Sequence, residues 1–138
     1  MSELVRVSMS LEQPLLDRLE DLIRNSRYTN RSEYIRDMIR ERLVHAAWEA
    51  NQEAVGTVTM VYNHHKRRLS QKLTELQHHH HTKVLAVTHV HLDEHLCAET
   101  ILMRGRAKEI RKLADLLRQQ KGVLHASLSM SSTGKNLS

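Results

Sequence analysis

The sequence lacks several features that would place it in other broad classes of protein. It has a single cysteine, Cys97, among 138 residues, which excludes an internal disulfide framework and fits a reducing compartment. No segment reaches the roughly 18 unbroken apolar residues that a membrane span needs. The N-terminus also lacks the charged-then-apolar pattern of a signal peptide. We therefore expect a soluble, cytoplasmic protein with no membrane partner.

Charge and length suggest a small oligomeric protein that is able to bind nucleic acid. A chain of 138 residues makes one domain or two small ones, and neither half can build a large core alone. The formal net charge is +5. Residues 1–48 carry eight Lys or Arg and eight Asp or Glu, so the excess lies around Lys66–Arg68 and along residues 104–121. The charge permits DNA binding but does not assign it to the N-terminal part.

The candidate chemistry of the chain is concentrated in residues 78–97. This stretch holds Cys97 and seven of the eleven histidines. Its second part alternates as a β-strand does, which places His89 and His91 on one face of the strand. Cys97 returns to these two histidines if the chain turns just before it.

Two imidazoles and a thiolate form a borderline-soft set of ligands. Such a set suits Ni(II), Cu(II) or Zn(II) and is poor for Mg(II) or Ca(II). One histidine of the run His78–His81 can fill a fourth position, either from the same chain or from a neighbour. The alternative is that these histidines are ordinary polar residues on a wetted sheet face. The combined spacing of the histidines and the cysteine favours a metal site.

The N-terminal residues predict a strand followed by two helices. Side chains alternate between apolar and polar over residues 5–11, and Pro14 marks the start of a helix that ends near Ser26. Asn30 is expected to cap a second helix that runs toward Trp48. A lone strand leaves its backbone groups without partners, so two chains are expected to pair their strands in an intertwined dimer.

The outward face of these paired strands carries polar side chains that can read DNA. They are Arg6, Ser8 and Ser10 of each chain. A two-stranded ribbon fits the major groove, where arginine donates two hydrogen bonds to guanine and a serine hydroxyl pairs with any base. The alternative is that the three residues only form the solvated face of an amphipathic strand.

The remaining residues alternate between strand and helix patterns. The expected elements are a strand at 55–62, a helix at 66–77, strands at 83–92 and 97–104, a helix at 106–121 and a strand at 123–130. This β-α-β-β-α-β order is the ferredoxin-like arrangement, in which both helices cover one face of the sheet. Val84, Ala86, Val90 and Leu92 suit the helix-covered face, so we expect His89 and His91 on the open face.

Four parts of the chain together resemble the nickel-responsive repressors of the NikR family. They are the strand Arg6–Leu11, the turn and helix Tyr28–Asp37, the run Gln77–His81, and His89–His91 with Cys97. The likeness runs from about residue 5 to residue 130. It implies an α+β fold, with an N-terminal ribbon-helix-helix domain (β-α-α) followed by a ferredoxin-like (ACT-type) β-α-β-β-α-β domain. The expected division is a DNA-binding domain at 1–48, a linker at 49–54, a metal-binding and tetramerisation domain at 55–131 and a flexible tail at 132–138.

The resemblance also implies the composition of the metal site. His89, His91 and Cys97 of one chain and His78 of a neighbouring chain would hold one Ni(II) per chain, in a planar set that Ni(II) accepts. Tyr62 and Glu99 would surround these ligands and orient the imidazoles. Whether other histidines form a second metal site stays open for His64, His65, His79, His80 and His81.

Further residues match positions with roles in the family. Glu33 and Asp37 match carboxylates that hold a cation, often potassium, between the domains, although a solvated helix face explains them as well. Lys66 and Arg67 match basic residues that touch the DNA backbone. Arg27 stands where the family often has glycine, and a left-handed cap there would cost about 1 kcal/mol.

The function implied is that of a nickel-dependent transcriptional repressor. As a homotetramer, a dimer of dimers, it would bind a palindromic double-stranded operator when Ni(II) is bound and control nickel uptake genes. An enzyme is not expected, because no oxyanion-hole or substrate-pocket signature appears. The alternative function is a metal- or metabolite-responsive ribbon-helix-helix repressor that senses another ligand.

Overall fold

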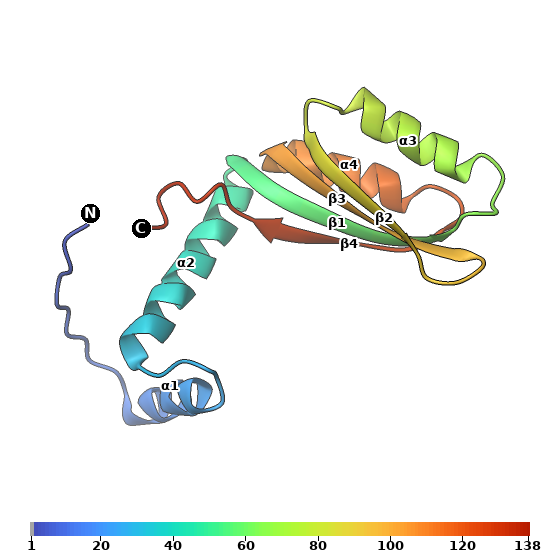
Figure 1. The fold of residues 1–138 in the computed structure, drawn as a ribbon. Helices are drawn as coiled ribbons and strands as arrows, with labels where there is room; N and C mark the ends of the chain where they lie inside the picture. Colours follow the sequence, from blue (N-terminus) through green and yellow to red (C-terminus); the bar gives the residue numbers. More distant parts are fainter. Residues whose placement is uncertain (1) are drawn as a thin grey trace. The chain divides into compact units, whose positions relative to one another are not determined.

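The computed structural model describes residues 2–138, which form two compact units (Figure 1). Among the described residues, the first unit runs as far as Leu43 and includes Asn136–Ser138, and the second comprises Val44–Lys135. Within residues 2–138, no helix combines the length and the apolar character that crossing a membrane requires.

The first unit contains two helices, α1 (Gln13–Arg24) and most of α2 (Arg31–Glu49). The side-chain oxygen of Asn30 accepts the backbone N–H of Glu33 at 2.9 Å, which is the predicted cap of α2. Left-handed backbone at non-glycine residues is confined, within residues 2–138, to Asn51, Arg68 and Asn136. The prediction of a left-handed, strained cap at Arg27 was therefore wrong. The chain leaves α1 through Asn25, whose backbone is in the right-handed region.

The predicted strand over residues 5–11 is not formed in the single chain. Residues 2–12 have no strand hydrogen bonds, and Val5 and Val7 are 77% and 75% exposed. The physical reason is the one that made a dimer expected: a strand needs a neighbour for its N–H and C=O groups.

The second unit has the predicted β-α-β-β-α-β order. Its elements are β1 (Glu53–Asn63), α3 (Leu69–His79), β2 (Val84–His91), β3 (Leu96–Arg106), α4 (Ala107–Arg118) and β4 (Val123–Ser131). The four strands are antiparallel in the order β2-β3-β1-β4. Figure 1 shows α3 and α4 on the same side of this sheet. The predicted fold of this domain is therefore confirmed.

The turn between β1 and α3 makes α3 begin later than residue 66. The side chain of Asn63 accepts the backbone N–H of His65 at 2.9 Å, and its carbonyl accepts that of Lys66 at 3.1 Å. Arg68 then adopts a left-handed conformation with φ of 64°. These bonds hold residues 64–68 in a turn, and the helix starts only at Leu69.

A single apolar core lies between the sheet and the two helices. Leucines of α3 and α4 pack against strand residues such as Val58, Met60 and Ile101, all of which are fully buried. Trp48, at the end of α2, joins this core, and its indole N–H donates to the carbonyl of Ser131 at 2.8 Å. The last residues of α2 are thus part of the second unit.

The sheet face predicted for the strand histidines was wrong. Opposite residues of an antiparallel pair share a face, and His89 lies opposite Glu99 while His91 lies opposite Cys97. Glu99 and Cys97 are buried on the helix-covered side, so the two histidines lie on that side as well.

An irregularity in β2 explains the error. The register shifts between Val84 and Ala86, so Val84 packs against the core while later even-numbered residues point the other way. Val90 and Leu92, which were expected under the helices, are 48% and 55% exposed.

Candidate metal centre

Three neighbouring strands bring the candidate ligands into two rows on the helix-covered face. In the first row, Tyr62 of β1 lies opposite Cys97 of β3, which lies opposite His91 of β2. In the next row, Glu99 of β3 lies opposite His89 of β2. The rows are adjacent because residues two apart on a strand share a face.

A third histidine joins the thiol of Cys97 from the turn after β1. The Nδ1 atoms of His64 and His91 lie 3.1 Å and 3.4 Å from the Cys97 sulfur. One ligand atom from each of the three residues lies within 4.8 Å of the other two. Within residues 2–138, this is the group of His, Cys, Asp and Glu side chains close enough to share an ion.

His89 lies beside this group and is held by other partners. Its ring centroid is 5.2 Å from that of His91. Its Nδ1 lies 3.3 Å from the Tyr62 hydroxyl and 3.6 Å from a carboxylate oxygen of Glu99. His89 is not among the residues whose ligand atoms lie within 4.8 Å of one another, so its exposed ring must move before His89 and Cys97 can share an ion.

Glu99 organises the polar side chains beneath the candidate ligands. The hydroxyl of Tyr62 donates to one of its oxygens at 2.8 Å, and the side-chain amide of Gln77 donates to the other at 2.8 Å. Burial, and then the nearby carboxylate, raise the pKa of the Tyr62 hydroxyl well above its usual value. Tyr62 therefore keeps its proton and donates it to Glu99. The carboxylate of Glu99 stays an acceptor, and it can also orient the nearby imidazole of His89.

His78 does not meet the other predicted ligands within one chain. It lies in the last turn of α3, where its ring is 6.0 Å from that of His81. This placement leaves the prediction of a shared site untested, since a ligand given by a neighbouring chain makes its contact only in an assembly.

Protonation favours metal binding at His64 and opposes it at Cys97. Burial, followed by the negative charges of Glu99 and Asp93, raises the pKa of the Cys97 thiol. Burial also lowers the pKa of the His64 imidazole, and neighbouring histidines add to the effect. A neutral imidazole is the form that binds a metal, whereas the thiol must lose its proton to do so. Nitrogen and sulfur donors of this kind fit nickel, copper or zinc.

The expected DNA-contacting residues lie at the surface. Arg6, Ser8 and Ser10 are exposed in the extended N-terminal segment, and Lys66 and Arg67 are exposed in the turn before α3.

The carboxylates expected to hold a cation have other partners within the first unit. Asp37 accepts hydrogen bonds from the Tyr28 hydroxyl and from the Arg40 guanidinium, and these bonds lower the pKa of its carboxyl group. Glu33 lies 3.9 Å from Arg36. A cation bound there would have to displace at least one of these groups.

His64 is the residue that the sequence did not single out as a principal ligand. It follows the end of β1, and β1 pairs with the strand that carries Cys97. The usable signal was a pair of histidines directly after a strand, but the order of strands in the sheet had to be known before that signal pointed to Cys97.

Comparison with protein families divides the chain into two matched regions. Residues 5–45 match the ribbon-helix-helix proteins of the copG family. Residues 55–131 match the NikR C-terminal nickel-binding domain.

Curated relatives match over nearly the whole chain. A Geobacter sulfurreducens protein, provisionally named a nickel-responsive regulator, is 51% identical over 138 residues, which are 99% of each chain. A Pyrococcus horikoshii protein with the same provisional name is 44% identical over 136 residues, 98% of this chain and 99% of the relative. Among solved structures, an uncharacterized protein from Thermotoga maritima covers 57% of this chain and 98% of its own, with a TM-score of 0.52 and 16% identity. That last likeness shows the fold alone.

A ribbon-helix-helix unit joined to a nickel-binding ferredoxin-like domain defines a DNA-binding, metal-responsive regulator. The chain belongs to the NikR family of nickel-responsive regulators. The family predicted from the residues is therefore confirmed, and it is a family of regulators.

Proposed function

We propose that this chain is a cytoplasmic, nickel-dependent transcriptional repressor. It binds a palindromic operator when Ni(II) is bound and controls genes for nickel uptake. The observation that carries the proposal is the buried thiol of Cys97 with two imidazoles within 4.8 Å of it and of each other, in a domain matched to nickel-binding proteins.

One nickel ion per chain is held by His89, His91 and Cys97 together with His78 of a neighbouring chain. The pairing of β2 with β3 supports the first three, because it places them in adjacent rows on one face. His64 is the alternative to His89, since its Nδ1 already lies 3.1 Å from the Cys97 sulfur. When bound, nickel would supply a positive centre that ties these side chains together.

The proposed assembly is a homotetramer made of two dimers. Within each dimer, the N-terminal segments pair as a ribbon, which would cover Val5, Val7 and Met9, now 77%, 75% and 59% exposed. Two dimers then join through their second units, in the arrangement that brings His78 of one chain to the ligands on the helix-covered face of another. The opposite sheet face leaves Val90 and Leu92 exposed as a further surface for contact between chains. Burying such apolar surface stabilises an interface by about 25 cal/mol per Å².

Each half of the chain then has its own role. Arg6, Ser8 and Ser10 of the paired ribbons read the operator bases, and Lys66 and Arg67 contact its phosphates. Nickel binding favours the arrangement of the tetramer that fits the operator, which couples the two sites energetically. A potassium ion at Glu33 and Asp37 is a further part of this proposal.

The test is an optical titration of the metal-free full-length protein with Ni(II). Four variants accompany the unchanged protein: Cys97→Ala, His89→Ala, His64→Ala and, as a matched control, His125→Ala on the exposed part of β4. We expect one nickel per chain with a thiolate-to-metal absorption band in the unchanged protein and in the control. Cys97→Ala should lose the band, and His89→Ala should bind nickel far more weakly than His64→Ala.

Nickel-dependent binding to promoter fragments of nickel-uptake genes then tests the second half of the proposal. A nickel titration indifferent to Cys97 would refute the metal site. Tight nickel binding with no change in affinity for those fragments would refute the role as a nickel-dependent repressor of them. Stronger losses in His64→Ala than in His89→Ala would replace His89 by His64 in the ligand set.

A further inference from the structure

The excess positive charge of the chain is concentrated around α4. Residues 104–121 contain seven Lys or Arg and two Asp or Glu, an excess that equals the formal net charge of +5 for the whole chain. Residues 1–48 contribute none of it, since eight basic residues there balance eight acidic ones. The DNA-reading unit is therefore neutral overall, and the metal-binding unit carries the charge.

Part of this charge is neutralised locally and part is not. Arg104 and Arg118 form salt bridges with carboxylates, at 3.0 Å and 3.2 Å. Within residues 2–138, Lys108, Arg111 and Lys112 have no carboxylate within 4.0 Å. Three uncompensated cations thus lie within little more than one turn of α4.

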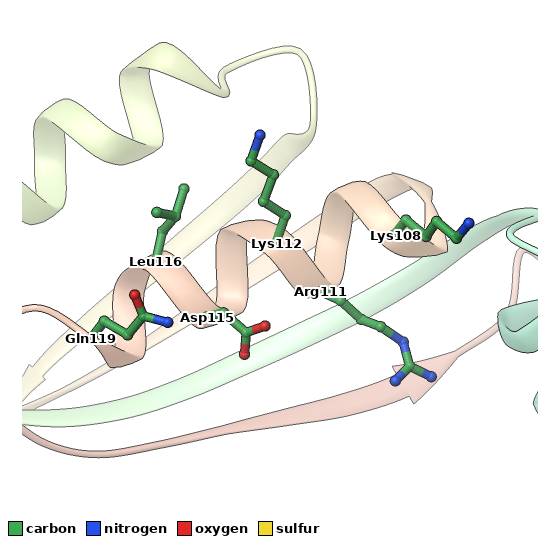
Figure 2. Close-up of a pocket in the computed structure, with 6 residues that line it drawn as sticks. All are labelled: Lys108, Arg111, Lys112, Asp115, Leu116 and Gln119. Atoms are coloured by element: carbon green, nitrogen blue, oxygen red, sulfur yellow. The ribbon is translucent and has the colours of Figure 1, made fainter.

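The three cations line a shallow hollow on the outer side of α4 (Figure 2). Arg111 is directed toward β4, lies 5.6 Å from the ring of Trp48 and donates to the sulfur of Met130 at 3.4 Å. Lys112 is directed the opposite way, and Lys108 precedes it by one turn of the helix. Of these three cations, Lys108 and Lys112 have no side-chain partner within residues 2–138, and both are exposed.

The far end of α4 adjoins the turn that contains Lys66. A Cβ placed on Gly122 would lie 3.4 Å from the Cγ atom of Lys66, so the turn after α4 contacts the turn before α3. Lys121 directly precedes Gly122. Lys108 and Lys112 lie in the first half of α4, and Lys121 and Lys66 lie in the two turns that meet beyond its last residue. These four lysines are here called the α4 stripe, and α4 itself is about 18 Å long for its twelve residues.

We propose that the α4 stripe contacts the phosphate backbone of double-stranded DNA when the protein is bound to it. This inference rests on the proposed function and extends the contact expected at Lys66. Lysine is a point charge on a flexible stem, which suits phosphates but reads no base sequence. Once the ribbons are bound, neighbouring DNA is present at a high effective concentration, so weak contacts of this kind add to affinity.

An acidic protein is the other polyanion that would be attracted to such a stripe. Protein interfaces are depleted in lysine and depend on buried aromatic or apolar anchors. Leu116 is the one apolar side chain among those that line the hollow, and the carboxylate among them, Asp115, is paired with Arg118 at 3.2 Å. The composition of the surface therefore favours DNA.

The test compares charge-neutralising variants of the nickel-loaded full-length protein. Lys108→Gln, Lys112→Gln and the double variant keep most of the side-chain length, and Lys135→Gln is the matched control in the exposed C-terminal tail. The probe is a fluorescent duplex of arbitrary sequence, because phosphate contacts do not depend on sequence. Affinity is measured by anisotropy at several salt concentrations.

Removing one lysine–phosphate interaction lowers the slope of log affinity against log salt by about 0.9. We expect a decrease of about 0.9 for each single variant, about 1.8 for the double variant and none for the control. At about 0.1 M salt, removing one such interaction should weaken DNA binding roughly tenfold.

Lysine acetylation read by mass spectrometry gives an independent measurement on the unchanged protein. DNA should slow the acetylation of Lys108 and Lys112 at least about threefold and leave Lys135 unaffected, if both bind phosphate with this strength. Slopes equal to that of the control, together with unprotected lysines, would overturn the α4 stripe. Weaker binding of the double variant to polyglutamate but not to DNA would overturn it in favour of an acidic protein. Failure of the proposed function looks different, because nickel would then leave the affinity of the unchanged protein for the promoter fragments unaltered.

Discussion

Replacing Glu99 by glutamine should both destabilise the second unit and weaken nickel binding. Glu99 is 7% exposed and accepts one hydrogen bond on each oxygen, from Tyr62 and from Gln77, both at 2.8 Å. Glutamine has the same shape, and both partners can reorient to pair with an amide. The main loss is the charge, because a hydrogen bond to a charged group contributes about 1 kcal/mol more than a neutral one.

Two such bonds give an expected loss of about 2 kcal/mol in the free energy of unfolding for Glu99→Gln. Glu99→Ala should cost more, about 4 kcal/mol, because it leaves the buried Tyr62 hydroxyl and the half-buried Gln77 amide without acceptors. The carboxylate also lies 3.6 Å from Nδ1 of His89. Losing the partner that orients a metal-binding imidazole typically lowers metal affinity tenfold to hundredfold, and we expect a loss of about that size here.

Urea unfolding of the metal-free protein at fixed protein concentration measures the first effect, and a nickel titration measures the second. Glu75→Gln is the control, because Glu75 is an exposed glutamate on α3. Equal results for Glu99→Gln and this control in both measurements would refute both roles of Glu99, in stability and in nickel binding. A stability loss without a change in nickel affinity would show that Glu99 supports the fold and does not position His89.

Four further predictions concern other parts of the chain. Gly56→Ala places a Cβ 2.8 to 3.2 Å from three core side chains and should cost about 1–3 kcal/mol in urea unfolding, whereas Gly105→Ala meets chiefly the flexible end of a lysine and should cost less. Asn30→Ala removes the cap of α2 and should lower the stability of the first unit by about 1 kcal/mol, visible as an earlier thermal loss of helical circular dichroism. Arg6→Ala should abolish specific operator binding in a gel-shift assay and leave one nickel per chain, so a lost nickel site would contradict the separation of roles. Because the pKa of the Cys97 thiol is raised and nickel needs the thiolate, apparent nickel affinity should rise up to about tenfold per pH unit from neutral pH toward that pKa; a titration series without that rise would contradict a thiolate ligand.

Much of the second unit was predictable because its patterns are local. The apolar period of each strand and helix between residues 55 and 131 can be read from a few neighbouring residues, and the resulting order of elements defines the fold. Helix boundaries were less predictable. The start of α3 at Leu69 depends on hydrogen bonds to Asn63 and on the left-handed conformation of Arg68.

The N-terminal strand shows a different limit. Its alternating residues are those of a strand, yet in one chain Val5 and Val7 stay exposed and the backbone has no strand partner. The pattern determines that the segment is suited to pairing, whereas the hydrogen bonds of a strand exist only when a second strand is present.

The metal centre shows most clearly which features follow from the local sequence and which depend on the tertiary structure. The sequence by itself determined that His89 and His91 share a face and that Cys97 follows them, because a strand has a period of two. Which face they occupy was decided by the register of β2 on β3 and by the shift after Val84. The approach of His64 to Cys97 was decided by the pairing of β1 with β3, since only the folded sheet brings residues 33 positions apart within 3.1 Å.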